Sequence, residues 1–590
     1  MQKFWKTNEY FYLIIILLIA CLLRFYGINW DQNQHLHPDE RFLTMVTQAI
    51  RWPSSIPEYF STSTSPLNPH NQNFPFYVYG TFPLFLIKAL SDITGLTDYN
   101  QITILGRFIS GLFDIAIILL VFLIGRRVFS SSVGLLAAFF YSVSVIPIQL
   151  SHFYAVDTFL NFFLTLTIYF LIKSIYSPKI IHFILAGISL GFAFASKVSA
   201  FLIGPPIILV FVYLLYHFRN KVFIWIGLFL SLTLLIFRVM QPYAFTGTSI
   251  FDFSINPKFI ANLTELQAFS KPGNYFPPAV QWNNTLPIIY PLKELFIWGL
   301  GIPAGIITII AFVTFLIKLL KNIIKSKLNI LRDPSFITRI VLTLVILTIF
   351  VYQGVQFAKP LRYFYPMLPA LIIITSYFIT EVLSKLTSRN RIIYFVFLIL
   401  IWSIWSLSFM SIYSRDHSRV QASEWIYQNI PAGSSISAEH WDDALPLNIQ
   451  GNSSNIYQFV EFPLYAKDTD EKWTEVAQKL KEVDYIILSS NRLYGGITRN
   501  LWMYPATSKY YQDLFSSKLG FEKIAEFTSR PSIPVPGISI CLILPFSDYG
   551  EVSKKYQECE QGGIVFVDDY IDETNTVYDH PKIIIFKKYE

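Results

Sequence analysis

Two adjacent carboxylates, Asp39 and Glu40, directly follow the first long apolar run of the chain, in the stretch HPDE. Taken alone, this short motif indicates a helix start, because proline suits the first helical position and acids in the first turn face the positive end of the helix dipole. Their position just beyond an apolar run gives them a second interpretation. Paired carboxylates at a membrane boundary can accept a proton or hold a cation, as a reaction centre requires.

Further ionisable residues lie within or at the ends of later apolar runs. Each such group in the hydrocarbon layer costs at least about 2.5 to 3.5 kcal/mol by insertion scales, so each is a candidate functional residue. The candidates are Arg24, Arg107, Asp114, Asp157, Lys197, Arg238 and Arg362.

These charges separate into two groups. Arg107, Asp157, Lys197 and Arg362 fall at or near the predicted outer ends of their spans, where they can meet the Asp39 loop. For the others we favour a structural interpretation, since long side chains near helix ends reach water easily. Arg24 and Arg238 are expected to extend to the membrane boundary. Asp114 is expected to pair with Arg107, two turns away on the same helix side.

His35 and His37 add two imidazoles to the loop that carries the acidic pair. Together with Asp39 and Glu40 they could ligate a divalent metal, but the imidazoles lack the helical spacing that would place both on one face. We therefore predict chemistry that requires no cofactor, with a divalent metal as the alternative.

Eleven apolar runs approach or reach the length of about 17 to 25 residues that a membrane-spanning helix needs. They lie near 10–28, 103–124, 133–150, 158–173, 180–196, 199–217, 222–240, 295–317, 339–353, 363–383 and 392–412. The runs predict a mainly α-helical, multi-pass protein of the plasma (inner) membrane over residues 1–412.

The charge distribution predicts the orientation. Residues 1–412 hold 29 of the 46 Lys and Arg residues but 14 of the 39 Asp and Glu residues. With a cytoplasmic N-terminus, 17 of those 29 cations lie in short cytoplasmic connections and ten of the 14 acids lie outside, as the positive-inside rule favours. This pattern argues against nucleic-acid binding. Three cysteines are too few for a disulfide scaffold.

Three parts of the chain lie outside the membrane in this topology. Residues 29–102 and 241–294 are long outer loops, and loops of that length on a helical scaffold usually carry function. Residues 413–590 alternate strand-like and helix-like segments, which predicts an extracytoplasmic α/β domain.

The predicted C-terminal domain contains two further features. Cys541 and Cys559 could pair in an oxidising compartment. The segment AEHWDDALP holds Glu439, His440, Asp442 and Asp443. These residues could form a metal or acceptor site, but we favour a solvated acidic loop, because charge clusters usually face water.

Several segments resemble the GT-C class of polytopic glycosyltransferases, and more closely its family 39, the protein O-mannosyltransferase and aminoarabinose-transferase group. The similar segments, in family order, are HPDERF, LGRFISGLFD, SHFYAVDTFLNFF, GFAFASKVSAFL, QWNNTLPIIYPLKELFIWGLGIPAG and KPLRYFYPMLPAL. They cover most of residues 1–383. The β-trefoil domains that mannosyltransferases of this family carry between spans are not visible here.

The resemblance implies an extracytoplasmic site that moves a sugar from a polyprenyl-phosphate donor to an acceptor hydroxyl with inversion. It matches Asp39 to the catalytic carboxylate, with Glu40 beside it, and Asp157 to a second acid. It matches Arg107 to an arginine near the donor phosphate, and more weakly Lys197 and Arg362 to basic positions there. The partners implied are the lipid donor, the bilayer and an acceptor that is protein, lipid or glycan.

Two other interpretations remain open. A lipid or glycan transporter or flippase also needs many spans and intramembrane charges, but it predicts charges near the bilayer centre and an internal repeat, and no repeat is visible. A non-catalytic envelope scaffold predicts that Asp39, Asp157 and Arg107 are scattered in space.

Overall fold

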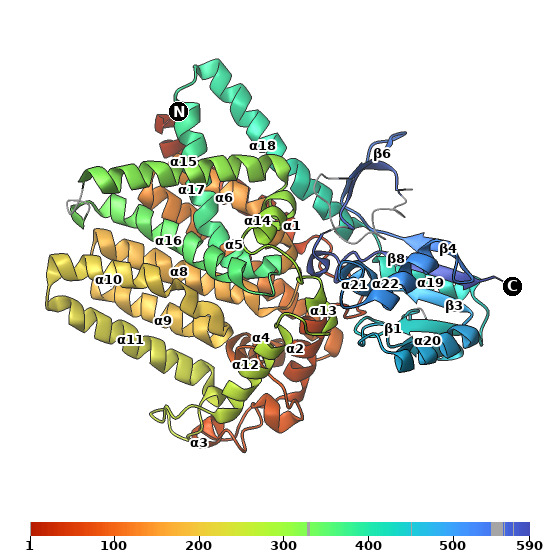
Figure 1. The fold of residues 1–590 in the computed structure, drawn as a ribbon. Coiled ribbons are helices and arrows are strands. Elements are labelled where there is room, and N and C mark those ends of the chain that lie inside the picture. The colour runs from red at the N-terminus through yellow and green to blue at the C-terminus, as the bar shows by residue number, and fades with distance from the viewer. Residues whose placement is uncertain are drawn as a thin grey trace.

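The computed structural model describes residues 2–326, 331–449, 451–543, 559, 561–569 and 571–589. Long helices form a bundle, and a smaller region with two β-sheets lies against one end of it (Figure 1). The N-terminal helix belongs to the bundle, and the C-terminus lies on the far side of the smaller region.

All eleven predicted apolar runs contain helix. Within the described residues, nine helical segments are long and apolar enough to cross a membrane. They comprise α1 (Gln2–Phe25), α5 (Tyr99–Val128), α8 (Val156–Tyr176), η2 with α10 (Val198–Ile203, Gly204–Phe218), α11 (Lys221–Met240), α15 (Ile302–Ser326), α16 (Pro334–Val355), η6 with α17 (Leu361–Met367, Leu368–Ser384) and α18 (Ser388–Met410). The chain is therefore an integral multi-pass membrane protein.

The other two runs are irregular. Residues 133–150 form α6 (Ser131–Ser142) and α7 (Val145–Ser151), which are bent by 58° and count as a tenth span if taken together. Residues 180–196 form α9 (Ile180–Ser196), which is apolar but short.

The run predicted at 295–317 begins later than expected. Helix α14 (Ile289–Glu294) leads into a π-helical turn, η4 (Leu295–Gly299). Gly301 then has a φ of 81°, and a Cβ there would lie 2.8 Å from Trp405 Cβ. Only glycine adopts this conformation without strain, so the chain breaks there and the long helix α15 starts at Ile302.

Both outer loops contain short helices. The first holds α2 (Pro38–Ala49), α3 (Ile56–Phe60), η1 (Pro69–Gln72) and α4 (Thr81–Thr94), and the second η3 (Pro242–Ala244), α12 (Pro257–Phe269) and α13 (Pro277–Val280). Helix α2 begins as the HPDE motif predicts, with Pro38 in its first turn and the His37 side chain accepting from the Glu40 backbone N–H. It packs on α4 and α5, which fixes the acidic pair against the bundle.

The C-terminal region has the predicted α/β pattern. Its helical elements are η7 (Ser411–Ser414), α19 (Ser418–Asn429), η8 (Ser454–Ile456), α20 (Asp470–Glu482), α21 (Arg492–Ile497), α22 (Pro505–Phe515) and η9 (Glu573–Asn575). Its strands are β1 (Ser435–Glu439), β2 (Gln458–Phe462), β3 (Tyr485–Leu488), β4 (Phe521–Phe527), β5 (Ser532–Ile533), β6 (Ser539–Ile543), β7 (Gly563–Val567) and β8 (Ile583–Lys588).

The strands form two sheets. The larger has the order β2-β1-β3-β8-β4, in which β1 is parallel to β2 and β3, and β8 is antiparallel to both neighbours. The smaller has the order β5-β7-β6. Cys541 on β6 forms a disulfide with Cys559, as the sequence allowed.

One predicted ion pair inside the bundle is wrong. Asp114 does not pair with Arg107 but with Arg24 of α1, whose Nε lies 2.8 Å from Asp114 Oδ2, and both side chains are fully buried. Helix α1 packs on α5 and α6, so Arg24 faces Asp114 instead of reaching water. Asp114 also accepts hydrogen bonds from the hydroxyls of Tyr141 and Tyr365.

Arg238 is likewise buried, contrary to prediction. Its guanidinium donates to the carbonyl oxygens of Pro242 at 3.0 Å, Gly247 at 2.8 Å and Ser249 at 2.9 Å, and it lies 4.6 Å from the Phe60 ring centroid. The side chain therefore holds the start of the second outer loop against α11.

The Arg24–Asp114 pair gives a test of stability. Arg24→Leu should destabilise the detergent-solubilised protein by about 3 to 5 kcal/mol, because it leaves an unpaired buried carboxylate. The double variant Arg24→Leu/Asp114→Leu should be more stable than Arg24→Leu alone. Denaturant unfolding measures both, and additive effects of the two changes would contradict the pairing.

Candidate functional site

Arg107 binds two carboxylates in a fully buried cluster in the N-terminal part of α5. Its Nη2 lies 2.7 Å from Asp31 Oδ2 and 2.5 Å from Glu40 Oε1, and its Nε donates to both Glu40 oxygens. Nη1 donates to the Ile28 carbonyl oxygen and to Asp31. The Trp30 ring centroid lies 4.7 Å from the guanidinium carbon. Arg107 therefore ties the end of α1 and the start of α2 to α5.

Asp39 lies beside this buried cluster and is less enclosed. Its carboxylate accepts from Arg362 Nη1 at 2.5 Å and from the Tyr79 hydroxyl at 2.9 Å. The side chains of Asp39 and Arg362 keep 22% and 25% of their exposure, whereas Arg107 and Glu40 keep none. Of the two adjacent acids, Asp39 is the one that an approaching molecule can reach.

Asp157 and Lys197 form a third ion pair, with Nζ 2.8 Å from Oδ1. Asp157 lies in the first turn of α8, and Lys197 follows the last residue of α9. The Tyr363 ring links this pair to Arg362, since it lies 4.7 Å from Lys197 Nζ and 5.8 Å from the Arg362 guanidinium. The structure thus brings all six sequence-predicted catalytic and phosphate-binding residues together.

Burial and ion pairing act in opposite directions on the three acids. Burial alone would raise the pKa of Asp39, but the Arg362 guanidinium holds it well below its usual range. Arg107 likewise lowers the pKa of Asp31 against the effect of burial. For Glu40 burial dominates and raises the pKa, although Arg107 opposes it. Asp39 is therefore ionised at neutral pH and available as a base.

Ring nitrogens of His35 and His37 contact neighbouring protein groups in this structure. The ring nitrogens of His35 contact Asn100 Oδ1 at 2.7 Å and Thr103 Oγ1 at 3.1 Å, and Nδ1 of His37 accepts from the Glu40 N–H. Burial lowers the pKa of His37 to about 4. Among the residues that the structure describes, no group of three or more His, Cys, Asp or Glu side chains is arranged to hold a metal.

The C-terminal segment 571–580 covers the site. The Tyr578 ring centroid lies 4.2 Å from that of His37. A cavity of about 20 Å³ remains between His37, Arg362, Gln149 and Tyr578, enough for roughly one water molecule. Arg362 Nε, which is buried, has no hydrogen-bond partner among the described residues.

Several hydrogen bonds anchor this segment to the bundle. Asp572 accepts from the Trp282 indole at 2.7 Å and from the Tyr290 hydroxyl at 3.2 Å. Asp579 accepts from Gln149 Nε2 at 3.0 Å and from the Tyr413 hydroxyl at 3.1 Å. The second outer loop, α7 and η7 therefore all hold the C-terminal segment in place.

The prediction that the acidic segment AEHWDDALP is a solvated loop is wrong for its two aspartates. Asp442 is nearly buried and pairs with Arg419 Nη2 at 2.7 Å, and Asp443 pairs with Arg419 Nη1 at 3.0 Å and with Arg41 Nη2 at 2.7 Å. Arg41 belongs to α2, one residue after Glu40. The aspartates therefore join the C-terminal region to the helix that carries the acidic pair. Glu439 is buried against the Tyr511 hydroxyl.

Three residues at the site are not among those predicted. Asp31 shares Arg107 with Glu40, Tyr79 donates to Asp39, and the Tyr578 ring packs at a tilt against the His37 ring. Asp31 could have been suspected from the sequence, because it follows the first apolar run within ten residues of the acidic pair. Tyr79 and Tyr578 have no local signal.

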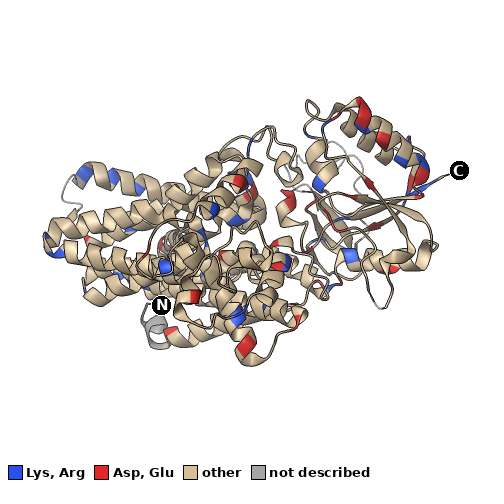
Figure 2. Cartoon of the chain, turned by 90° about the horizontal axis from the view of Figure 1, so that it is seen from below, with Lys and Arg blue, Asp and Glu red and all other residues tan. Residues whose placement is uncertain are grey.

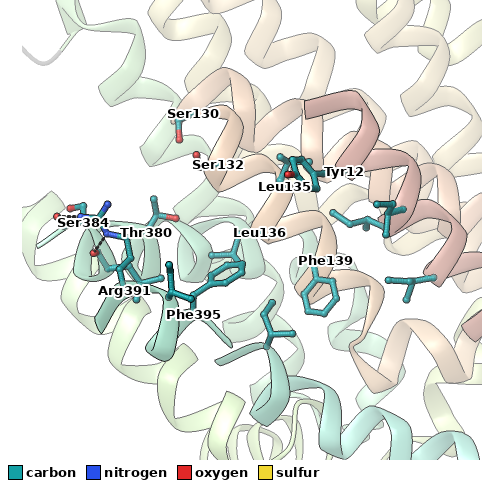
Figure 3. Close-up of a pocket in the computed structure, with 16 residues that line it drawn as sticks. Tyr12, Ser130, Ser132, Leu135, Leu136, Phe139, Thr380, Ser384, Arg391 and Phe395 are labelled. Atoms are coloured by element: carbon teal, nitrogen blue, oxygen red, sulfur yellow. Dashed lines mark hydrogen bonds between the residues drawn. The ribbon is translucent and has the colours of Figure 1, made fainter. Parts of the chain in front are cut away.

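A cavity of about 700 Å³ lies elsewhere, between α1, α6, α17 and α18 (Figure 3). Its walls are mostly apolar, with Ile16, Leu136, Phe139 and Phe395 among them, and its polar lining includes Arg391. None of the six predicted catalytic and phosphate-binding residues contributes to it, so we do not assign the reaction to this cavity.

Comparisons with known proteins agree with the fold. A family model described as dolichyl-phosphate-mannose-protein mannosyltransferase matches residues 83–241. No curated protein sequence matches the chain significantly.

Solved structures of oligosaccharyltransferase from Archaeoglobus fulgidus are similar over most of this chain. The apo form has a TM-score of 0.52 at 14% identity, and the match spans 87% of this chain and 73% of the oligosaccharyltransferase chain. The complex of this enzyme, AglB, with an inhibitory peptide and a dolichol-phosphate has a TM-score of 0.52 at 13% identity, covering 86% and 72%. ArnT from Cupriavidus metallidurans has a TM-score of 0.44 at 12% identity, covering 84% and 94%. The predicted resemblance to GT-C glycosyltransferases is confirmed, and the chain has their fold.

The buried His580 gives a pH-dependent test of the C-terminal segment. It lies between Asp579, 2.5 Å from Nδ1, and Asp568, 2.9 Å from Nε2. Although burial alone would lower the pKa of His580, these carboxylates raise it to about 10. Because the pKa is raised in the folded state, the stability from this charge is fully present below about pH 6.5 and is lost as the pH rises towards 10.

We expect the stability difference between the native protein and His580→Gln to be largest near pH 6 and to shrink steadily towards pH 10. Thermal unfolding in detergent over this range measures the difference. His440→Gln is the matched control, because His440 is partly exposed. A difference that does not change with pH would show that His580 is not charged in the folded protein.

Proposed function

We propose that the protein is a membrane glycosyltransferase that moves a sugar from a polyprenyl-phosphate donor to an acceptor hydroxyl, with inversion, on the extracytoplasmic side. The observation that carries the proposal is the pairing of the partly exposed Asp39 with Arg362 at the ends of the membrane helices. The match to a dolichyl-phosphate-mannose transferase model and the fold shared with an oligosaccharyltransferase solved with dolichol-phosphate support it.

In this proposal Asp39 is the general base. It accepts the acceptor's hydroxyl proton while the oxygen attacks the anomeric carbon and the bond from that carbon to the phosphate oxygen breaks. The departing lipid phosphate is a good leaving group that needs charge stabilisation more than a proton. Arg362 and Lys197 supply that charge at the membrane boundary, where the low dielectric strengthens each contact. This step requires no cofactor.

Arg362 couples donor binding to the base. In the structure its guanidinium is engaged by Asp39 and holds the pKa of that carboxyl low. A donor phosphate that competes for Arg362 would weaken this hold, and the pKa of Asp39 would rise towards its ordinary value. Asp39 would then become a stronger base only when the donor is present.

Arg107 has a positioning role in this proposal. The sequence resemblance matched it to an arginine near the donor phosphate, but its hydrogen bonds go to Asp31, Glu40 and Ile28, and its side chain is fully buried. It fixes α2, and therefore Asp39, against α5. Glu40 serves the same purpose, and Asp157 balances the charge of Lys197.

The first experiment tests Asp39 as the general base. Asp39→Asn should leave the protein folded and inserted but lower transfer by about 10² or more, the typical contribution of a general base. The assay incubates membranes with radiolabelled polyprenyl-phosphate sugars and follows the label into protein, lipid and glycan fractions. Asp98→Asn is the control, since Asp98 is the N-cap of α5 and asparagine caps equally well. Undiminished transfer by Asp39→Asn would remove Asp39 from the mechanism.

Substitution of Arg362 and of Arg107 should have different effects. Arg362→Gln should yield folded protein with a donor KM raised about 10- to 100-fold, because one charged hydrogen bond to phosphate is lost. Arg107→Gln should instead reduce the yield of folded protein, since two buried carboxylates lose their partner. Arg51→Gln, which changes an exposed arginine of the first outer loop, should change neither. Normal expression of Arg107→Gln with a raised donor KM would return Arg107 to the phosphate site.

The rival functions predict other arrangements. A non-catalytic scaffold does not require Asp39, Arg362, Lys197 and Asp157 to cluster, yet ion pairs and one tyrosine ring connect them. A flippase predicts charges along a path through the membrane. The pair of Arg24 and Asp114 inside the bundle is fully buried and lines no such path, which supports the transferase.

A further inference from the structure

A second charged hollow lies at the opposite end of the helices that carry the candidate site. It has a volume of about 370 Å³ and is formed by the end of α5, the end of α8 and the start of α9. Its walls are Leu123, Arg126, Arg127, Tyr169, Lys173, Ser177 and His182. We call it the basic pocket.

Helix geometry separates the two sites by about one membrane thickness. Arg107 and Arg127 are both on α5 and are 20 residues apart, which corresponds to about 30 Å along an α-helix. The hydrocarbon core of a bilayer is about as thick. Figure 2 shows Lys and Arg residues at the end of the bundle farthest from the C-terminal region.

The cations of the basic pocket are not neutralised within it. No Asp or Glu lines the pocket. In the part of the chain that the structure describes, neither Arg127 nor Lys173 has a carboxylate within 4.0 Å. Arg127 instead lies 4.5 Å from the Tyr176 ring centroid and Lys173 5.4 Å from that of Tyr169. Arg126 alone has an acidic partner, Glu9, at 2.9 Å.

Such an arrangement is suited to an anion. Like charges that share one hollow repel each other unless a counter-charge enters, and the aromatic rings hold the cations without cancelling their charge. The apolar side chain of Leu123 and the ring of Tyr169 also face the pocket, so the ligand has carbon atoms beside its charge. Basic pockets between membrane helices on the cytoplasmic side bind anionic lipid headgroups.

We propose that the basic pocket binds the phosphate headgroup of an anionic phospholipid from the leaflet on the basic side of the protein. Arg127 and Lys173 contact the phosphate, and Leu123 and Tyr169 contact the adjoining carbons. This site is independent of the proposed transfer reaction, and its occupancy is measured without any sugar donor.

Native mass spectrometry of the detergent-solubilised full chain tests the site. Phosphatidylglycerol should bind with an affinity at least about tenfold above that of phosphatidylcholine, and Arg127→Gln/Lys173→Gln should abolish this preference. Arg127→Lys/Lys173→Arg keeps both charges and should retain it. Arg219→Gln/Lys221→Gln is the matched control, because it removes one Arg and one Lys from the exposed α10–α11 turn and should also retain it.

Any of four results would overturn the proposal. One is equal binding of the two lipids by the native chain. Another is an unchanged preference in the folded Arg127→Gln/Lys173→Gln variant, with folding checked by circular dichroism, or an equal loss in the control. The last is displacement of the lipid by inorganic phosphate at equal concentration, which would identify free phosphate as the ligand.

Discussion

The fold around the site depends on the burial of one guanidinium. Arg107 has no exposure to water, so its charge must be met by protein groups, and Asp31 and Glu40 together meet it. Removing Arg107 would leave both carboxylates buried without their cation. Because Asp31 follows α1 and Glu40 belongs to α2, this single requirement fixes the first outer loop on α5. The position of Asp39 follows from its place beside Glu40.

The sequence predicted well what depends on local pattern. Apolar runs long enough to cross a bilayer indicated the helices. Charges at their ends indicated one cluster, and the structure pairs Asp39 with Arg362 and Asp157 with Lys197. The pairing of Asp114 was wrong because helical spacing cannot compare a partner on the same helix with one on a neighbour. Only the packing of α1 on α5 places Arg24 within reach.

The cover over the site could not have been predicted in the same way. Tyr578 follows the acidic pair by more than 500 residues, and nothing in its neighbourhood marks it. Its place results from many weak constraints, including Asp572 on Trp282 and Asp579 on Tyr413. The aspartates at 442 and 443 show the same limit. In the sequence they form an acidic cluster. Only the folded structure brings Arg41 and Arg419 close enough to pair with them, and these pairs link the C-terminal region to α2.

The ion pairing at the two ends of the helices differs in a way that fits different tasks. At the candidate site each cation has a carboxylate partner, so a phosphate must compete with Asp39 for Arg362. In the proposed reaction, this competition lowers the affinity for the donor but lets donor binding change the pKa of Asp39, which suits a donor that must react and leave. In the basic pocket Arg127 and Lys173 are held by aromatic rings, so an anion gains their full charge. That arrangement favours a resident ligand over one that turns over.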